Sequence, residues 1–467
     1  MTALFAMLLV AQAAPAQTAA TAPPAGAPRE TPPEAGPPKD FRLPAAHKLT
    51  LDNGLAVTFV QYGSTPKAMV ALEVRAGNVD EAPNQVWLAD LTGDMLVEGT
   101  RTRSAAQIAE QSANMGGSVN VAVSSDLAEI SADVLRESTA EAVRLVADVI
   151  RNPSFPEQDF ARRRADRLRQ LAIARAQPRA LATEKFLAVL YPEHPYGRYL
   201  PKQEDLKALT VEQARSFHEK NYSAARSHLY VVGQFDEKQV EAAIREAFSD
   251  WKKGTPAPDA KPSPRAQRAV YLVDRPGAVQ STLYVGMPVA ADPSSPDYVK
   301  LVVTNTLLGG SFMSRITSNI REQKGYTYSP SSQVSTRRRD AYWAEIADVT
   351  TKDTGASLKE IFAEISRLQK EPPTPEELKG IARYAGGIFV LQNSSRRGIV
   401  NQLRFVDLNG LPDDYLSTYV QRVNAVTPQD VQQMAAKYIQ DGRAAIVVVG
   451  DLKVVKDQVT TYGTIAD

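Results

Sequence analysis

The chain of 467 residues contains no cysteine and only four histidines, at positions 47, 194, 218 and 228. The absence of cysteine excludes disulfide bonds, Cys-ligated zinc, iron–sulfur clusters and thiol nucleophiles. No two of the histidines stand four residues apart, so no helix can present a pair of imidazoles from one face to a metal ion.

The sequence also lacks an excess of either charge and a long apolar run in its main part. Lys and Arg number 54 and Asp and Glu 53, which gives a net charge of +1, with both signs scattered along the chain. Such a balance creates no field for phosphate backbones. Beyond the N-terminus no eighteen consecutive residues are apolar. We therefore expect no nucleic-acid partner and no membrane insertion.

The N-terminus does carry a short apolar run, which predicts export. Residues 1–16 are apolar and end in the small residues Ala14-Pro15-Ala16, a pattern typical of a cleaved signal peptide. Because the run has no basic start, an upstream start or an Ala-rich disordered tail is the alternative. Residues 17–40 are rich in Pro and Ala and are expected to be disordered. The prediction is a periplasmic or otherwise exported protein.

The folded part divides into two halves that look like copies. The proline-rich stretch 254–268 separates a predicted domain over 41–253 from another over 269–467. Leu209–Gln213 leads to a strand ending at Gly233, and Val426–Asp430 leads to a strand ending at Gly450. The offset is 217 for both the threonines (427 − 210) and the glycines (450 − 233). A gapless match of this length indicates duplication.

Within each half, strands come first and helices follow, which predicts an α+β fold of two domains of about 200 residues each. Asn53-Gly54 predicts a hairpin, because this dipeptide suits a tight turn between strands. In the first half the pattern predicts strands over 48–51, 55–60 and 68–75, paired strands within 118–134, and helices over 85–97, 105–115, 139–151 and 156–176. Pro156 is expected at the first helical position, and Gln177-Pro178 is expected to stop that helix.

The segment Val86–Thr100 carries the most informative motif. It resembles the zinc-site helix of the M16 (pitrilysin/insulinase-type) metallopeptidases, in which the motif HxxEH is followed by Met, an apolar pair and Gly-Thr. That motif supplies two zinc-binding imidazoles and a Glu base for the metal-bound water. Here the frame reads DxxGD, with Asp90 and Asp94 at the imidazole positions and Gly93 at the position of the base.

The resemblance also implies a third ligand, a Glu, about eighty residues later. The corresponding position here is Gln170, in a helix that also holds Arg162, Arg163, Arg164, Arg167 and Arg169. One interpretation is that the aspartates pair with arginines of this helix where zinc would have been. The alternatives are solvated aspartates, or Asp90 and Asp94 as oxygen ligands of calcium or magnesium. We expect no metal and no cofactor in this chain.

The second half carries a different signature of the same family. Leu307–Arg315 contains Gly309-Gly310, and Ile320–Ser329 contains Arg321 and, seven residues on, Tyr328. In the family an Arg and a Tyr at this spacing reach the substrate, so the resemblance implies this role for Arg321 and Tyr328, with Gly309 and Gly310 beside the substrate. A guanidinium and a phenol can both donate to a developing oxyanion.

Arg275–Ser281 and Asn409–Tyr415 extend the resemblance, which runs from about Leu49 to Val449. It is strongest with the M16B branch, in which two chains of this size face each other as half clam shells, one holding HxxEH and the other the Arg/Tyr pair. The resemblance therefore implies a non-catalytic, substrate-binding subunit of a heterodimeric peptidase, inactive alone, with zinc in the HxxEH-bearing partner and peptides as substrates. The alternatives are an inert scaffold subunit and a hydrolase that uses Asp90 and Asp94 with another metal.

Overall fold

The computed structural model describes residues 43–259, 261–265 and 267–466. The predicted signal peptide over 1–16 and the Pro/Ala-rich segment over 17–40 lie outside the described residues. Within the described ranges, no helix combines the length and the apolar character needed to cross a bilayer.

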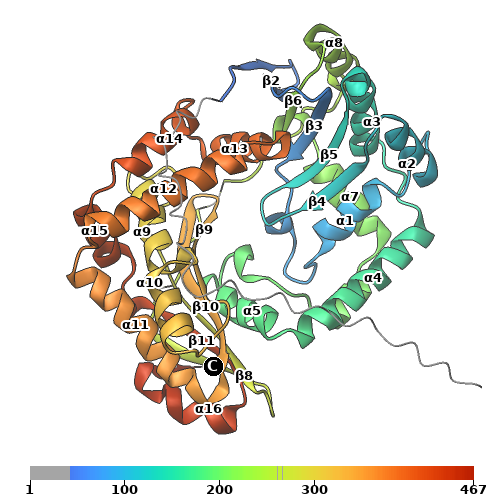
Figure 1. The fold of residues 1–467 in the computed structure, drawn as a ribbon. Coiled ribbons are helices and arrows are strands. Elements are labelled where there is room, and N and C mark those ends of the chain that lie inside the picture. The colour runs from blue at the N-terminus through green and yellow to red at the C-terminus, as the bar shows by residue number, and fades with distance from the viewer. Residues whose placement is uncertain (1–42, 260, 266, 467) are drawn as a thin grey trace, which may run out of the picture. The chain divides into compact units, whose positions relative to one another are not determined.

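The first half folds into a six-stranded mixed sheet with the order β1-β2-β6-β3-β5-β4 (Figure 1). Its strands are β1 (Ala46–Thr50), β2 (Ala56–Gln61), β3 (Lys67–Val74), β4 (Val119–Val123), β5 (Ala128–Leu135) and β6 (Ser227–Gly233). The predicted hairpin is present, since β1 and β2 pair antiparallel. Gly54 adopts φ +90° in its turn, and the Asn53 amide donates to the carbonyl of Phe248 at 2.7 Å. Glycine suits this turn because a Cβ disfavours positive φ.

Helices cover one face of this sheet and complete the first core. The α-helices of this half are α1 (Leu88–Leu96), α2 (Ala105–Asn114), α3 (Thr139–Arg151), α4 (Glu157–Ala176), α5 (Pro178–Leu190), α6 (Gln203–Ala208), α7 (Val211–Asn221) and α8 (Glu237–Phe248). Of these, α5 does not join the first core. Apolar side chains of α1, α3, α7 and α8 join the strands in one buried cluster. The bounds of α3 equal the predicted range. Pro156 was predicted as the first residue of a helix, but α4 begins at Glu157 and Pro156 is its N-cap residue. Pro178 is the first residue of α5.

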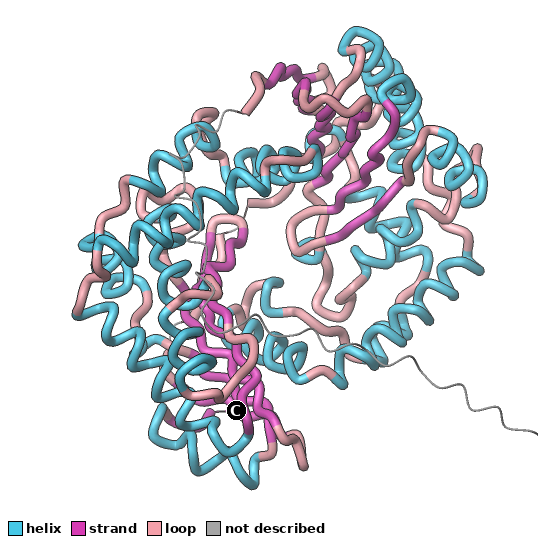
Figure 2. The backbone as a smooth tube through the Cα atoms, viewed as in Figure 1, coloured by secondary structure: helices cyan, strands magenta, loops and turns pink. Residues whose placement is uncertain are grey.

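The second half repeats this plan with the order β12-β7-β11-β8-β10-β9. Figure 2 shows its strands in magenta beside helices in cyan. Its strands are β7 (Ala269–Asp274), β8 (Gln280–Pro288), β9 (Ser331–Arg337), β10 (Asp340–Thr350), β11 (Ala445–Gly450) and β12 (Thr464–Ala466). Its helices are α9 (Tyr298–Asn305), α10 (Arg315–Thr317), α11 (Thr354–Lys370), α12 (Pro375–Gln392), α13 (Arg396–Asn409), α14 (Tyr415–Asn424), α15 (Pro428–Tyr438) and α16 (Leu452–Val459). The stretch 254–268 holds no helix or strand among its described residues.

The repeat is visible in matched elements. Helices α7 and α15 both have 11 residues and begin 217 positions apart (428 − 211), each behind a threonine capping box. The sheets differ at one edge. There, β1 pairs antiparallel with β2, whereas β12 pairs parallel with β7. The structure therefore has two α+β units with the same strand order in five of the six positions.

Two matched helices pack on the other half's sheet. Helix α5 of the first half lies against β8 and β11, with the Phe186 ring stacked on Tyr284 at 4.2 Å. Helix α13 of the second half lies against β3 and β6, and its Arg396 donates through Nε and Nη2 to the carboxylate of Asp133 on the neighbouring β5. The α5 contact is largely apolar, whereas α13 adds several ion pairs to a smaller apolar cluster.

Candidate functional site

Helix α1 carries Asp90, Gly93 and Asp94, and an unusual turn sets its start. Trp87 precedes the helix at φ +73°, and its side chain provides no cap. The buried carboxyl of Glu81 takes that role, accepting the backbone N–H groups of Trp87 at 3.2 Å and Ala89 at 2.8 Å. Burial raises the pKa of Glu81 to about 8, although these bonds act in the opposite direction. The start of α1 thus depends on an acid that sequence reasoning did not identify.

The structure brings Asp90, Asp94 and Gln170 together around the guanidinium of Arg167, on α4. Arg167 donates to Asp94 through Nε at 2.7 Å and through Nη2 at 2.9 Å, a fork-to-carboxylate pair. Its Nη1 donates to Asp90 at 3.2 Å and to the Gln170 side-chain oxygen at 3.3 Å. Asn78 donates to the second oxygen of Asp90 at 2.7 Å. We call Asp90, Asp94, Arg167 and Gln170 the Arg167 cluster.

The Arg167 cluster is mostly shielded from solvent. The side chains of Arg167, Asp90 and Asp94 are 18%, 18% and 26% exposed. Burial raises the pKa of Asp90, although the charge of Arg167 acts in the opposite direction. Burial lowers the pKa of Arg167, but its bonds to Asp94 and the charge of Asp90 outweigh this effect and leave the pKa raised. The guanidinium therefore stays charged between the two carboxyl groups.

Gly93 stands at the position of the Glu in the HxxEH motif that this segment resembles, and the space beside it is filled. A Cβ on Gly93 would lie 2.7 Å from Cγ2 of Val123 and 3.3 Å from Cγ1 of Val121. Both valines belong to β4, against which α1 packs. A longer side chain therefore cannot enter unless the strand or its valines shift, so no base can occupy this position in the present packing.

These residues do not fit the zinc that the family implies. The positions of its ligands hold two carboxyl groups and an amide, and the Arg167 guanidinium already binds all three. A divalent cation would have to displace a bidentate ion pair and lie beside a positive charge. Among the described residues, no group of three or more His, Cys, Asp or Glu side chains is placed to hold a metal ion.

The other arginines of α4 have different partners. Arg162 and Arg163 both bind the carboxylate of Glu98, just after α1. Arg164 donates to the carbonyl of Leu209 at 2.6 Å, and Arg169 pairs with Asp166 on its own helix. Of the three arrangements considered for Asp90 and Asp94, the ion-paired one is found, and one arginine of the five forms it.

Arg321 and Tyr328 also lie together. Arg321 belongs to a π-helical turn, η6 (Ser318–Gln323), and Tyr328 follows it in the loop before β9. The guanidinium carbon lies 4.3 Å from the centre of the Phe312 ring and 4.9 Å from that of Tyr328. Its Nε also pairs with Glu322 at 3.1 Å. Residues Phe312 and Tyr328 are 59% and 79% exposed, and their rings cover the guanidinium, so the Arg321 side chain is only 23% exposed.

Gly309 and Gly310 form the end of a second π-helical turn, η5 (Thr306–Gly310). A Cβ on Gly309 would lie 2.5 Å from the Ser332 hydroxyl and 2.6 Å from a carboxyl oxygen of Glu345. A Cβ on Gly310 would lie 2.5 Å from the Asn305 side-chain nitrogen. Glu345 is fully buried, and this burial raises its pKa well above the usual range. The two glycines are thus required by close packing, Gly309 over polar side chains of the sheet and Gly310 over Asn305 of α9.

Comparison with known proteins agrees with this architecture. Residues 57–204 match the model of the insulinase family, peptidase family M16, and residues 208–384 match that of the peptidase M16 inactive domain. An uncharacterized zinc protease of Streptomyces coelicolor is 25% identical over 416 residues, which are 87% of this chain and 90% of that protein. One of Mycobacterium tuberculosis is 26% identical over 432 residues, 87% of this chain and 93% of that protein.

Two solved structures share the fold. A peptidase M16 inactive domain from Pseudomonas fluorescens superposes with a TM-score of 0.80 at 24% identity, over 87% of this chain and 98% of that one. A protease from Helicobacter pylori superposes with a TM-score of 0.82 at 20% identity, over 88% and 100%. The duplicated α+β units, the motif frame on α1 and these matches lead to one conclusion: the chain belongs to the M16 family of peptidases.

Proposed function

We propose that this chain is the non-catalytic subunit of a heterodimeric zinc peptidase of the M16B type. It forms the chamber with an HxxEH-bearing chain, which holds the zinc, and it supplies Arg321 and Tyr328 to the bound peptide. The observation that carries the proposal is the contrast between two arginines. Arg167 is bound by the groups at the metal-ligand positions, whereas Arg321, 23% exposed, forms an ion pair with Glu322 alone among the described residues and lies beside an exposed phenol.

The state of the Arg167 cluster supports the non-catalytic part of the proposal. Peptide hydrolysis by a zinc peptidase needs an open metal position and a base for its water. Here the carboxyl groups are paired with Arg167, and packing against Val123 leaves no room for a side chain at residue 93. The same observations argue against a hydrolase that uses Asp90 and Asp94 with another metal.

The surface around Arg321 supports the substrate-binding part. Cleavage of a peptide bond places negative charge on the carbonyl oxygen, and donors fixed around that oxygen stabilise the transition state. The guanidinium has five N–H donors, and its ion pair with Glu322 uses few of them. The Tyr328 side chain is 79% exposed, so its hydroxyl is accessible to a substrate carbonyl.

The test is turnover by the complex reconstituted from this chain and an HxxEH-bearing chain. Arg321→Ala or Tyr328→Phe should lower kcat by roughly 10²–10³, the usual effect of removing one oxyanion donor. Tyr384→Phe, which changes another exposed tyrosine on α12, is the matched control and should leave turnover unchanged. Size-exclusion chromatography should show the same complex for all variants.

Two results would contradict the proposal. Unchanged turnover in both variants would remove the assigned role of Arg321 and Tyr328. Loss of the complex in Tyr328→Phe would make this surface a contact between subunits, as the scaffold alternative requires.

Export is the remaining part of the proposal. Cleavage after the Ala-Pro-Ala pattern gives a mature chain that starts near Gln17, outside the cytoplasm. Fractionation with N-terminal sequencing tests this expectation, and full-length chain in the cytosolic fraction would contradict it.

A further inference from the structure

A polar pocket lies between the two halves, beside the Arg167 cluster. Its volume is about 440 Å³. Helix α5 packs on β8 and β11 in the middle of the second sheet, and β9 is the strand at one edge of that sheet. The pocket is lined by residues of α5 and β9, and in the first half by the turn η3 (Pro195–Gly197), Trp87 and Asp90. It therefore reaches from the second sheet to the start of α1.

Strand β9 directs alternate side chains to this pocket. Gln333, Ser335 and Arg337 line it, as the two-residue period of a strand predicts. The Arg337 guanidinium carbon lies 5.5 Å from the centre of the Tyr342 ring and 5.7 Å from that of Tyr196. A strand and two aromatic side chains thus hold the guanidinium at the pocket.

Arg337 has no counter-charge within ion-pair distance among the described residues. Its Nη1 donates to the Ser335 hydroxyl at 3.3 Å and to the Thr336 carbonyl at 3.1 Å. Within the described part of the chain, its buried Nε has no hydrogen-bond partner, and its accessible Nη2 has none either. The two arginines that follow it in the chain both pair with Asp259. Arg337 therefore offers a free donor and an unpaired charge.

The carboxyl groups near Arg337 are already bound by other side chains. The charge of Asp126 acts on Arg337 without an ion pair, and its carboxylate accepts from the Tyr196 hydroxyl at 2.6 Å. Asp90 supplies the carboxyl group in the lining, and it accepts from Arg167. Neither carboxyl group therefore neutralises Arg337 directly.

A second arginine adds positive charge to the lining. Arg198 donates through Nη1 to the carbonyl of Glu81 at 2.8 Å, and a carbonyl carries no formal charge. A guanidinium does not lose its proton in proteins, and a shielded cation without a counter-charge is costly. A carboxylate in the pocket would offset this cost through charge-assisted hydrogen bonds.

We propose that this pocket binds the carboxylate side chain of a Glu or Asp in a peptide, and that the peptides cleaved by the complex are acidic. The substrate role rests on the proposed function, whereas binding needs this chain alone. Arg337 is nine residues after Tyr328 (337 − 328), so no more than about 32 Å of chain separates them. A peptide of about ten extended residues can therefore contact both.

The probes are a peptide of about twelve residues with two adjacent Glu at its centre, the same peptide with Gln at those positions, and acetate. Both peptides are capped, so that their termini carry no charge. Calorimetry with the isolated chain at constant ionic strength measures binding. The Glu peptide should bind saturably, and about tenfold or more tightly than the Gln peptide and acetate, because it alone brings both a carboxylate and a peptide backbone.

Two variants test the pocket. Arg337→Gln should weaken binding of the Glu peptide about tenfold or more, because it removes the charged donor. Since Arg337 packs between two rings, thermal unfolding of this variant is measured as well. Gln333→Glu changes an exposed residue of the lining and places a carboxylate in the pocket, so it should weaken binding without disturbing the fold.

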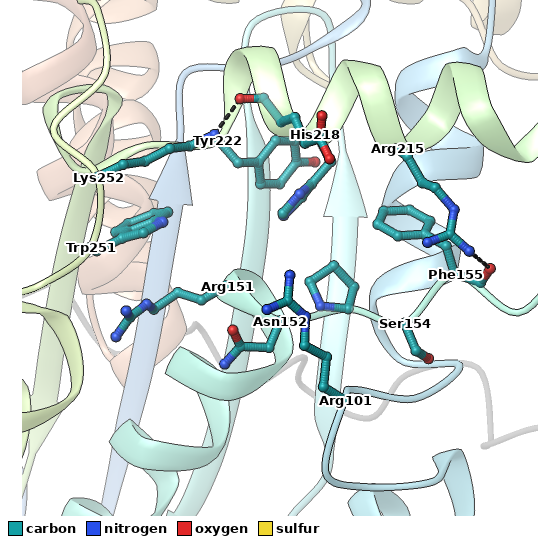
Figure 3. A pocket seen from close by; sticks show the side chains of 12 residues that line it. Arg101, Arg151, Asn152, Ser154, Phe155, Arg215, His218, Tyr222, Trp251 and Lys252 are labelled. Carbon is teal, nitrogen blue, oxygen red and sulfur yellow. Dashed lines mark hydrogen bonds between the residues drawn. The ribbon is translucent and has the colours of Figure 1, made fainter.

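Arg101→Gln is the matched control, because it removes the same charge elsewhere. Arg101 is exposed and lines another hollow, in the first half, which Figure 3 shows. The aromatic side chains of that hollow, Phe155, Tyr222 and Trp251, are buried and offer no open face to a ligand. This variant should bind the Glu peptide as the unmodified chain does.

Failure of this proposal can be distinguished from failure of the proposed function. In the reconstituted complex, the ratio of kcat/KM for the Glu peptide to that for the Gln peptide should fall in Arg337→Gln. Lower turnover in Arg321→Ala without a preference for Glu would support the proposed function and overturn the acidic-peptide site. Binding of the Glu peptide by the isolated chain without an effect of Arg321→Ala would do the reverse.

Four binding results would overturn the proposal. They are equal affinity for the Glu and Gln peptides, acetate binding as tightly as the Glu peptide, unchanged affinity in both pocket variants, and an equal loss in Arg101→Gln.

Discussion

Two arginines, one in each half, are similarly buried but have different partners. Arg167 lies between two carboxyl groups and is 18% exposed. Arg321 lies between the rings of Phe312 and Tyr328 and is 23% exposed, while Tyr328 beside it is 79% exposed. In the first case the protein itself uses the donors of the guanidinium. In the second, the protein uses only Nε, in the ion pair with Glu322, among the described residues. The comparison teaches that burial alone does not decide how many of an arginine's donors the protein itself uses.

Glycines near the edge strand extend the comparison between the two halves. Gly93 packs against Val121 and Val123 of β4, and Gly309 packs against Ser332 of β9. Strands β4 and β9 hold the same place in the two sheets. In each half a glycine thus lies close to the edge strand. Its neighbours are valines in the first half and polar side chains in the second.

The largest expected effect comes from opening the Arg167 cluster. Arg167→Met should lower the free energy of unfolding by about 4 kcal/mol, because it leaves Asp90 and Asp94 close together and unpaired. Urea denaturation measures the change. Arg169→Met on the same helix is the control, since Arg169 is exposed and pairs only within α4. Equal loss in both variants would show that the cluster is no more than a surface ion pair.

A smaller effect should appear in the pH dependence of the same region. The pKa of Glu81 is about 8 in the folded chain, above its usual value of 4.5. Between these values the folded state binds one proton more than the unfolded state, so stability falls as pH rises. From about pH 5.5 to 7.5 this residue should cost about 3 kcal/mol.

Glu81→Gln should remove that part of the slope, because the amide resembles the protonated acid and does not titrate. Denaturation at both pH values measures it, with the exposed Glu376→Gln on α12 as control. A slope as steep in Glu81→Gln as in the unmodified chain would mean that the acid is ionised in the folded protein.

The smallest effect is expected at the open surface. Tyr328→Phe should change the free energy of unfolding by less than about 0.5 kcal/mol, because the ring is retained and the hydroxyl is exposed. Thermal unfolding of the isolated chain measures this. A loss above about 1 kcal/mol would show that the phenol supports the fold and would weaken the contrast with Arg167.

Local patterns predicted much of the fold and missed its long-range packing. The periodicity of residues 139–151 predicted α3, and the gapless match at an offset of 217 predicted the duplication. Both patterns can be recognised in the sequence without knowing any contact between distant residues. Pro178 ended α4 as expected, yet it also opens α5, whose apolar residues face β8 and β11 of the other half. No local pattern predicts which strands α5 packs against, because those strands begin ninety or more residues later in the chain.

The candidate site was predictable to the level of its elements. The DxxGD frame and the arginine-rich helix predicted where Asp90, Asp94 and Gln170 meet positive charge. Which arginine binds them was not predictable, because Glu98 competes for Arg162 and Arg163. No sequence motif singled out Asn78 or Glu81. Both precede α1 and contact its residues only in the folded chain.

The central claim is that Arg167 takes the place that zinc has in catalytic members of the family. Its most direct test is the zinc content of the purified chain after incubation with zinc and removal of the excess, measured by elemental mass spectrometry. The account predicts no stoichiometric zinc and no peptide cleavage by the chain alone. One zinc per chain that is lost in Asp90→Ala would contradict it.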